Sequence, residues 1–342
     1  MSSHARVSLN EEQCDQLAAD LGAIKIPSDE EEPTTHLQLD PDALANFYFV
    51  VVAICHQTSP RNGPPLEGRI DGRLYRGWDY LREAFAIAVR ANPRIVYPEC
   101  LIGLQPRDLD RIIRTPDNSA TLSDLSGRCA LLHATGQRLI DRGWQSVQDV
   151  HRLSSGFIER EKPPGLLMLL SEFTAYRDPV RKKSLYFLSL MRNHGLWQYQ
   201  DDNALAAPVD YHEVRGHLRY GTVSIHDPEL REALTRGAPI DSDADLAIRS
   251  AVSRAIIHVS KRTGHSPSVL HYFFWNLFRN CCPRTATHCH GCSSDCRLPN
   301  RYRDAEFADS DRKGMRCQLS EHCLSRDAEI KLLDHSTDTD YY

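Results

Sequence analysis

The sequence predicts an all-α fold, and three observations support this class. Apolar residues recur at helical spacing in most segments, and strand-like alternation is scarce. Proline or glycine interrupts the pattern about every fifteen to twenty residues. These features favour about ten short helices arranged in two lobes or one large helical body.

The predicted elements follow one another in order along the chain. Cys14, Leu17 and Leu21 indicate a short first helix, and the acidic, proline-containing stretch 29–33 is typical of a linker. A buried helix is expected from residue 41 onward, with apolar positions between 44 and 54, followed by a loop rich in proline and glycine over 59–65. Apolar periodicity predicts the remaining helices near residues 73–89, 106–114, 122–142, 165–173, 182–195, 212–220 and 244–261.

Composition and patterning suggest four parts: an N-terminal helix with its linker (1–40), a helical body (41–280), a cysteine loop (281–300) and a polar tail (301–342). With 342 residues, 41% hydrophobic and 25% charged, the chain can bury a full core. The formal net charge of −5 disfavours wide, nonspecific contact with nucleic-acid phosphates, although a local basic face remains compatible with it. The longest apolar run, 47–55, is too short to cross a bilayer, so we expect a cytoplasmic protein without a membrane segment.

Four cysteines near the C-terminus carry the strongest chemical signal. Cys282, Cys289, Cys292 and Cys296 form the pattern C-x6-C-x2-C-x3-C after an apolar run at 270–278. Such clustering suits one tetrahedral zinc ion or one iron–sulfur cluster, and the close spacings favour a [4Fe–4S] cluster over zinc. Cys281 can replace Cys282 as the first ligand.

Other residues around the cysteines allow more than one interpretation. Cys317 and Cys323 are either ordinary tail residues or a second site. Arg279, Arg284 and Arg297 can form a local basic patch near the cysteine loop, or they can simply be exposed.

Asp210 is the candidate catalytic residue. It lies just before the predicted helix 212–220, where an aspartate commonly acts as an N-cap. A carboxylate held there also stays ionised and can stabilise the cationic sugar that forms as an N-glycosidic bond breaks, or align an attacking water. Tyr211 and His212 follow it directly and either orient a substrate or pack against neighbours.

Two further positions are weighed against simpler interpretations. His56 and Gln57 end the first buried helix, and Gln57 can contact a base or merely serve as a polar helix end. The run Arg181, Lys182 and Lys183 is interpreted as a solvated helix start, with a Schiff-base lysine as the alternative.

Residues 209–215, Val-Asp-Tyr-His-Glu-Val-Arg, resemble a segment of the helix-hairpin-helix base-excision glycosylases, in which the aspartate is the catalytic carboxylate. Residues 52–59, ending His-Gln-Thr-Ser, are similar to the early helix of those proteins, and residues 104–114 to the helix that follows it. The cysteine pattern resembles the iron–sulfur loop of the endonuclease III and adenine glycosylase branches. The resemblance implies a helix-hairpin-helix glycosylase-like fold with a cysteine-ligated cluster loop, and a nucleic-acid substrate.

A second resemblance is to the queuosine salvage proteins, which are nucleotide N-glycosidases. It is carried by residues 72–78, 176–178, the Asp210–Tyr211 pair and the aromatic run that ends at Trp275. Both resemblances select Asp210.

The sequence therefore leaves three functions open. The favoured one is an N-glycosidase that releases a modified or damaged base from nucleic acid. The alternatives are an N-glycosidase acting on a free modified nucleotide and a noncatalytic, metal-bearing protein that binds nucleic acid.

Overall fold

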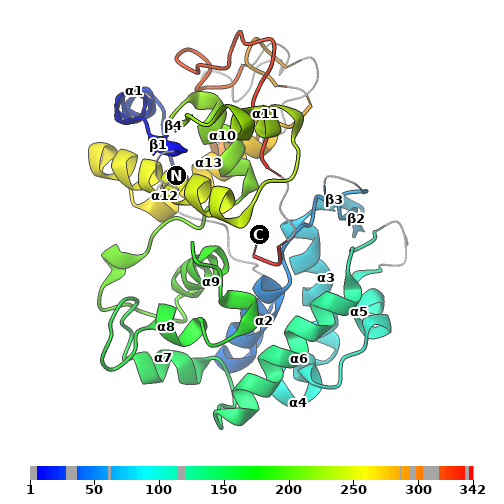
Figure 1. Ribbon diagram of the computed structural model, residues 1–342. Helices are drawn as coiled ribbons and strands as arrows, with labels where there is room; N and C mark the ends of the chain where they lie inside the picture. The colour runs from blue at the N-terminus through cyan, green and yellow to red at the C-terminus, as the bar shows by residue number, and fades with distance from the viewer. Residues whose placement is uncertain are drawn as a thin grey trace. The chain divides into compact units, whose positions relative to one another are not determined.

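The computed structural model describes residues 6–27, 37–60, 63–114, 120–285, 287–292, 298–302, 316–335 and 339–341, and the chain forms two compact units. Unit 1 consists of Met1–Glu31 and Ala206–Asp338, and unit 2 of Glu32–Leu205 and Thr339–Tyr342. The described residues form thirteen α-helices and four short strands (Figure 1). The expected helical class is therefore confirmed, while the helix-hairpin-helix fold stays a prediction. The predicted acidic linker at 29–33 lies outside the described residues.

Unit 2 contains most of the short helices. Its α-helices are α2 (Pro41–Ala53), α3 (Trp78–Ala91), α4 (Pro98–Leu101), α5 (Pro106–Ile113), α6 (Leu125–Asp141), α7 (Gln148–Ser154), α8 (Leu166–Leu170) and α9 (Lys182–Asn193). One hairpin, β2 (Glu67–Ile70) with β3 (Arg73–Arg76), and three 3-10 turns, η2 (Pro93–Val96), η3 (Thr174–Tyr176) and η4 (Asp202–Ala204), complete it.

Helix α2 forms the centre of unit 2. Residues 45–53 are all buried, because α3, α6, α7 and α9 pack around this helix. A helix that is apolar on every side is stable only when it is surrounded in this way. The continuous apolar sequence of this segment therefore fixes its place in the core. The helix ends at Ala53, so His56 and Gln57, which were predicted to end it, lie in the loop that follows.

The β2–β3 hairpin corrects one predicted helix. The helix expected over 73–89 begins only at Trp78, because residues 73–76 pair with residues 67–70 as an antiparallel strand. Asp71 and Gly72 form the two-residue turn with φ values of 49° and 77°. Asp-Gly is a preferred sequence for such turns, since both residues need positive φ. The sequence thus held a hairpin signal that the apolar periodicity concealed.

Unit 1 joins the two ends of the chain. Its elements are β1 (Val7–Leu9), α1 (Glu11–Gly22), α10 (Tyr211–Tyr220), β4 (Val223–Ile225), α11 (Pro228–Arg236), α12 (Ser242–Thr263), α13 (Pro267–Cys281) and the 3-10 turn η5 (Asn300–Tyr302). Strand β1 pairs antiparallel with β4, and α1 packs against α12. These pairings bring the N-terminal segment to the core of unit 1.

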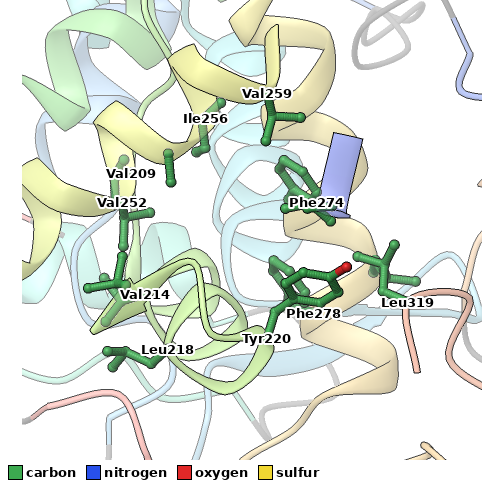
Figure 2. Close-up of a cluster of buried hydrophobic side chains, with 14 of the residues drawn as sticks. Val209, Val214, Leu218, Tyr220, Val252, Ile256, Val259, Phe274, Phe278 and Leu319 are labelled. Carbon is green, nitrogen blue, oxygen red and sulfur yellow. The ribbon is translucent and has the colours of Figure 1, made fainter. Parts of the chain in front are cut away.

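The core of unit 1 lies between α10, α12 and α13 (Figure 2). Helices α10 and α13 approach closely at Gly216, where an added Cβ would lie 2.1 Å from the Cδ2 atom of Phe278. Only glycine leaves room for the aromatic ring at this position. The close packing fixes the N-terminus of α10, which carries Asp210, against α13, which leads into the cysteine loop.

The other helix predictions agree closely with the structure. Eight helices lie within or across the predicted ranges, with ends that differ by a few residues. They are α1, α2, α5, α6, α8, α9, α10 and α12. Helices α4, α7, α11 and α13 were not predicted. Among the described helices, none combines the length and the hydropathy that a bilayer crossing requires.

Candidate functional site

Asp210 caps the N-terminus of α10. Its Oδ1 atom accepts hydrogen bonds from the backbone N–H groups of His212 at 2.7 Å and Glu213 at 3.2 Å. Glu213 completes a capping box, because its Oε2 atom accepts from the Asp210 N–H at 3.1 Å. The residue is only 6% exposed. The capping interpretation is confirmed, and the N–H donors and the helix dipole favour the ionised carboxylate. The catalytic role of Asp210 stays a prediction.

Half-buried aromatic and arginine side chains surround the start of α10. The rings of Tyr211 and His212 lie 4.2 Å apart, and His212 lies 6.2 Å from Trp275. Arg279 stacks 4.6 Å from the centre of the Trp275 ring, and Arg284 lies 5.2 Å from that of Tyr211. We call these five residues the aromatic–arginine face. Flat rings and guanidinium groups together suit a ligand that carries a base and a phosphate.

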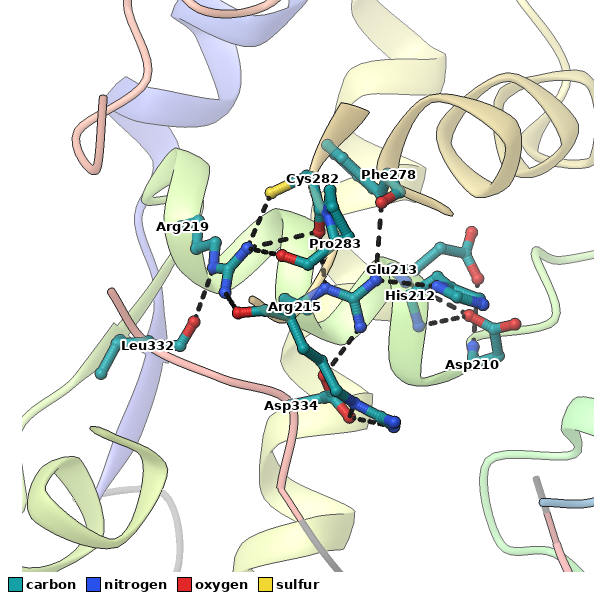
Figure 3. A network of polar contacts seen from close by, with 11 residues as sticks. Asp210, His212, Glu213, Arg215, Arg219, Phe278, Cys282, Pro283, Leu332 and Asp334 are labelled. Atoms are coloured by element: carbon teal, nitrogen blue, oxygen red, sulfur yellow. Dashed lines mark hydrogen bonds and ion pairs between the residues drawn. The ribbon is translucent and has the colours of Figure 1, made fainter. Parts of the chain in front are cut away.

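Asp334 holds two arginines at this face (Figure 3). Its carboxylate accepts from Nη1 of Arg215 and from Nη2 of Arg284, both at 2.7 Å. Burial raises the pKa of Asp334, but the two guanidinium groups lower it more, to about 2. The ionised Asp334 therefore fixes Arg284 over the Tyr211 ring and Arg215 beside His212, whose Nδ1 atom accepts from Nη2 of Arg215 at 2.8 Å.

A second buried polar pair lies under the start of α10. Glu213 is fully buried, and its Oε1 atom lies 2.9 Å from Nδ1 of His271 on α13. Glu213 therefore links the N-cap residue Asp210 to α13 through its two carboxylate oxygens. This link fixes the direction of the first turn of α10.

Arg219 supplies a buried positive charge beside the cysteines. Its guanidinium donates to the carbonyl oxygens of Leu332, Cys282, Pro283 and Arg284, and Nη1 lies 3.2 Å from the Cys282 Sγ atom (Figure 3). Arg219 is 2% exposed, and its contacts with described residues include no carboxylate. A buried cation is costly without a counter-charge, and a thiolate on Cys282 would supply one. The side chains present therefore fit a thiolate-ligated metal group.

The structure describes three of the four predicted cysteine ligands. Cys282 and Cys289 are buried and Cys292 is half-buried, while Cys296 lies outside the described residues. Cys281, the alternative first ligand, is buried at the end of α13. Assignment of these residues to a metal stays a prediction.

The distances between the thiol groups bear on the kind of metal. Sulfur atoms around one zinc ion lie about 3.8 Å apart, because each Zn–S bond is about 2.3 Å. In the part of the chain that the structure describes, no three cysteine sulfurs lie within 4.8 Å of one another. The described thiol groups are therefore not gathered around a single zinc ion, and the kind of metal stays a prediction.

In unit 2, two buried cations bind the carbonyl groups that end α2. Lys183 donates from Nζ to the Ala53 carbonyl oxygen at 2.5 Å. Arg128 donates to the carbonyl oxygens of Ile54 and His56, the latter at 2.8 Å. Both cations are fully buried. The last carbonyls of a helix lack partners within it and carry partial negative charge, so these cations stabilise the end of α2.

The burial of Lys183 corrects one prediction. Arg181 is exposed and Lys182 half-buried, as expected for a solvated helix start, but Lys183 faces the end of α2 and is inaccessible to water. Successive residues of a helix point in different directions, so a pair of lysines need not share one environment. Burial lowers the pKa of Lys183 to about 7, with smaller effects from neighbouring charges.

His56 lies between Lys183 and the C-terminal residues. Its Nδ1 atom is 3.4 Å from Lys183 Nζ, and its Nε2 atom is 3.5 Å from Oδ1 of Asp340. Burial, and then the charges of Lys183 and Arg128, lower the pKa of His56, so the ring is neutral at neutral pH. Lys183 has protons to donate to Nδ1, which places the ring proton on Nε2, toward Asp340.

Gln57 also contacts the C-terminal residues. Its Nε2 atom donates to the Thr339 carbonyl oxygen at 3.0 Å, and its backbone adopts a positive φ of 45°. Candidate ligand atoms of His56, Asp124 and Asp340 lie within 4.8 Å of one another. Lys183 and Arg128 lie beside this trio, and their charges would repel a divalent cation. We therefore do not interpret it as a metal centre.

The predicted site residues thus fall into two groups. Asp210, Tyr211 and His212 lie together in unit 1, whereas His56 and Gln57 lie together in unit 2. Sequence reasoning missed three buried charged residues, Asp334, Arg219 and Arg128, because their partners are distant in sequence. The capping-box pattern of Asp210 and Glu213 was visible in the sequence.

Comparison with models of known protein families finds no match to this chain. Comparison with the sequences of curated proteins also finds no match.

Proposed function

We propose that the chain is an N-glycosidase-type enzyme that releases a modified or damaged base from nucleic acid. The observation that carries this proposal is Asp210, a nearly buried carboxylate held by two N–H groups at the helix start, directly beside the aromatic–arginine face. A rigid anion beside flat rings suits a reaction in which positive charge develops on a sugar while its base leaves.

Each group has a defined chemical task in this proposal. As the bond between C1′ and the base nitrogen breaks, its electron pair leaves with the base, which takes up a proton. The Asp210 carboxylate stabilises the positive charge on the sugar, and a water oxygen then bonds to C1′ and releases its proton. Stacking on Tyr211 or Trp275 favours a base that has been turned out of its helix.

Arg279 and Arg284 support an anionic substrate. Arg284 is fixed by Asp334 and is close enough to interact electrostatically with Asp210 and Tyr211. Burial lowers the pKa of Arg284, but its partners raise it more, so this cation is permanent. A phosphate next to the reacting sugar would find a charge-assisted donor there.

The proposal includes a structural [4Fe–4S] cluster held by cysteines of unit 1. The buried cation of Arg219, which lies against the Cys282 sulfur atom, supports such a group, and zinc is the alternative. When bound, the cluster would fix the loop after α13 and would take no part in the reaction.

One observation favours a second candidate, an N-glycosidase that acts on a free modified nucleotide. The chain is acidic, with 46 Asp and Glu against 41 Lys and Arg, which suits a small anionic ligand in a local basic site better than a long polyanion.

The test measures base release from two substrate sets. One set contains oligonucleotides that carry single modified or damaged bases, and the other contains modified nucleoside 5′-monophosphates. The variant Asp210→Asn keeps a good N-cap but loses the charge, so we expect release to fall by at least about a hundredfold. Asp227 caps α11 through the same pair of N–H contacts, to residues two and three positions later. Asp227→Asn is therefore the matched control and should keep full activity.

The outcome separates the candidates. Release from oligonucleotides supports the proposal, and release only from monophosphates supports the second candidate. Full activity in Asp210→Asn would refute the catalytic role of Asp210. Salt-sensitive oligonucleotide binding without any release would indicate a noncatalytic binding protein.

A further inference from the structure

Cys317 lies beside the cysteine loop, although the sequence separates it from Cys289 by 28 residues. The Cys317 N–H donates to the carbonyl oxygen of His288 at 2.8 Å, and the His288 N–H donates to the carbonyl oxygen of Cys281 at 2.9 Å. The Cys281 side chain also hydrogen-bonds to that of Cys317. Three short segments of backbone are therefore tied together, and each of them carries cysteines.

Cys323 is fixed from another direction. Its Sγ atom donates to the carbonyl oxygen of Arg219 at 3.4 Å, and the backbone after it continues along the end of α10. The guanidinium of the same Arg219 contacts the Cys282 Sγ atom at 3.2 Å. Arg219 thus contacts two cysteine sulfur atoms: its backbone carbonyl accepts from Cys323, and its guanidinium contacts Cys282.

These contacts identify a set of four cysteines. Cys282 and Cys323 contact Arg219, and Cys289 and Cys317 lie on the segments that the hydrogen bonds at His288 join. Cys282, Cys289 and Cys317 each also have an electrostatic effect on Cys323. Cys282, Cys289 and Cys317 are buried and Cys323 is half-buried.

We propose that Cys282, Cys289, Cys317 and Cys323 are the thiolates that hold the metal group of this protein. This set keeps two residues of the C-x6-C-x2-C-x3-C pattern and replaces the other two by cysteines from the C-terminal segment. The inference shares its iron–sulfur cluster with the proposed function but does not require base release.

Charge and chain connection support this set. Coordination deprotonates thiols, and the resulting negative charge would neutralise the buried Arg219, which has no carboxylate among its contacts with described residues. Cys282 and Cys289 precede residues 293–315, and Cys317 and Cys323 follow them. A metal shared by these cysteines would therefore also attach the C-terminal segment to the core of unit 1. Asp334, which fixes Arg215 and Arg284, lies eleven residues after Cys323 in that same segment. The metal would thereby support the geometry of the aromatic–arginine face.

The test compares metal content among serine variants of the full-length chain purified without oxygen. Iron, acid-labile sulfide and zinc are measured per chain, together with the visible absorption spectrum. We expect Cys317→Ser and Cys323→Ser each to lower the metal content at least about tenfold, since even residues outside the ligand shell change metal affinity by that much. Cys292→Ser should retain the metal. Cys129→Ser is the control, because Cys129 is buried in unit 2, away from the loop.

A second measurement uses the wild-type protein, so that misfolding of a variant cannot decide the result. The half-buried Cys292 and Cys323 are compared for alkylation before and after chelation of the metal, with peptide mass spectrometry as the readout. We expect Cys323 to react only after chelation and Cys292 to react in both states.

Three results would overturn the inference: full metal content in Cys317→Ser and Cys323→Ser, loss of the metal in Cys292→Ser, or a wild-type protein without metal. If the metal is zinc and its content falls in the same serine variants, the ligand set is supported and the iron–sulfur cluster of the proposed function is refuted. If the wild-type protein releases no base but its metal content depends on these four cysteines, the proposed function is refuted and the ligand set is supported.

Discussion

Replacement of Lys183 by methionine tests the buried charge at the end of α2. Lys183 is fully buried, and its pKa is lowered from 10.5 to about 7, mainly by burial. At pH 7 about half of these lysines would be neutral, against about one in three thousand for an ordinary lysine. Methionine keeps the approximate shape and removes both the charge and the hydrogen bond to Ala53.

The pKa values determine the sign and size of the effect. Below pH 7 the lysine is charged in both the folded and the unfolded chain, and the full cost of burying the charge is present. Between pH 7 and 10.5 the unfolded chain binds more protons than the folded one, so stability rises with pH. Integration from pH 6 to 9 gives a gain of about 2–3 kcal/mol in the free energy of unfolding, which Lys183→Met should lack.

The assay is denaturant unfolding at several pH values, followed by tryptophan fluorescence. Trp78, Trp144 and Trp197 lie in unit 2, so a Trp275→Phe background restricts the signal to that unit. Lys182→Met is the matched control, since the charge of the half-buried Lys182 contributes only a minor part of the lowered pKa of Lys183 and its removal should leave most of the pH dependence in place. Equal pH dependence in wild type and Lys183→Met would refute the argument that Lys183 is buried with a lowered pKa.

Three further substitutions test the packing and charge of unit 1 by their effect on the free energy of unfolding. Asp210→Ala should cost about 1 kcal/mol through loss of the N-cap, whereas Asp210→Asn should cost a few tenths at most; equal losses would contradict the capping geometry. Asp334→Asn leaves two arginines without their counter-charge and should cost about 3–5 kcal/mol, while Glu232→Gln, in an exposed ion pair, should have little effect. Gly216→Ala should cost about 1–3 kcal/mol because its Cβ meets Phe278, and Gly22→Ala, which meets nothing within 4 Å, should not destabilise.

A chemical test addresses Lys183 as the alternative Schiff-base residue. Borohydride reduces a Schiff base to a stable covalent bond, so an oligonucleotide with an abasic site would be trapped on the protein if an amine attacks it. Because Lys183 is fully buried and donates to the Ala53 carbonyl, we expect no trapped product. A product that is absent in Lys183→Met and present in Lys182→Met would contradict the purely structural role of Lys183.

The sequence by itself predicted the helices and the kind of chemistry that the chain can carry. Apolar spacing identified α2, α6, α9, α10 and α12, because the side of a helix that packs inward repeats every three to four residues. The position of Asp210 before an apolar helix indicated its capping role, since N-caps depend on residues only two or three positions away. The density of cysteines near the C-terminus indicated a thiolate site. These features are local, so a single stretch of sequence contains them.

Only the tertiary structure decided which charged residues are buried and which groups meet. Lys182 and Lys183 are identical in type and adjacent, yet one lies half in solvent and the other binds the end of a helix 130 residues earlier in the chain. Asp334 meets Arg215 across 119 residues, and Cys323 meets Arg219 across 104. The physical reason is that desolvation and charge pairing depend on every segment that packs around a group, and a local sequence pattern contains no information about those segments.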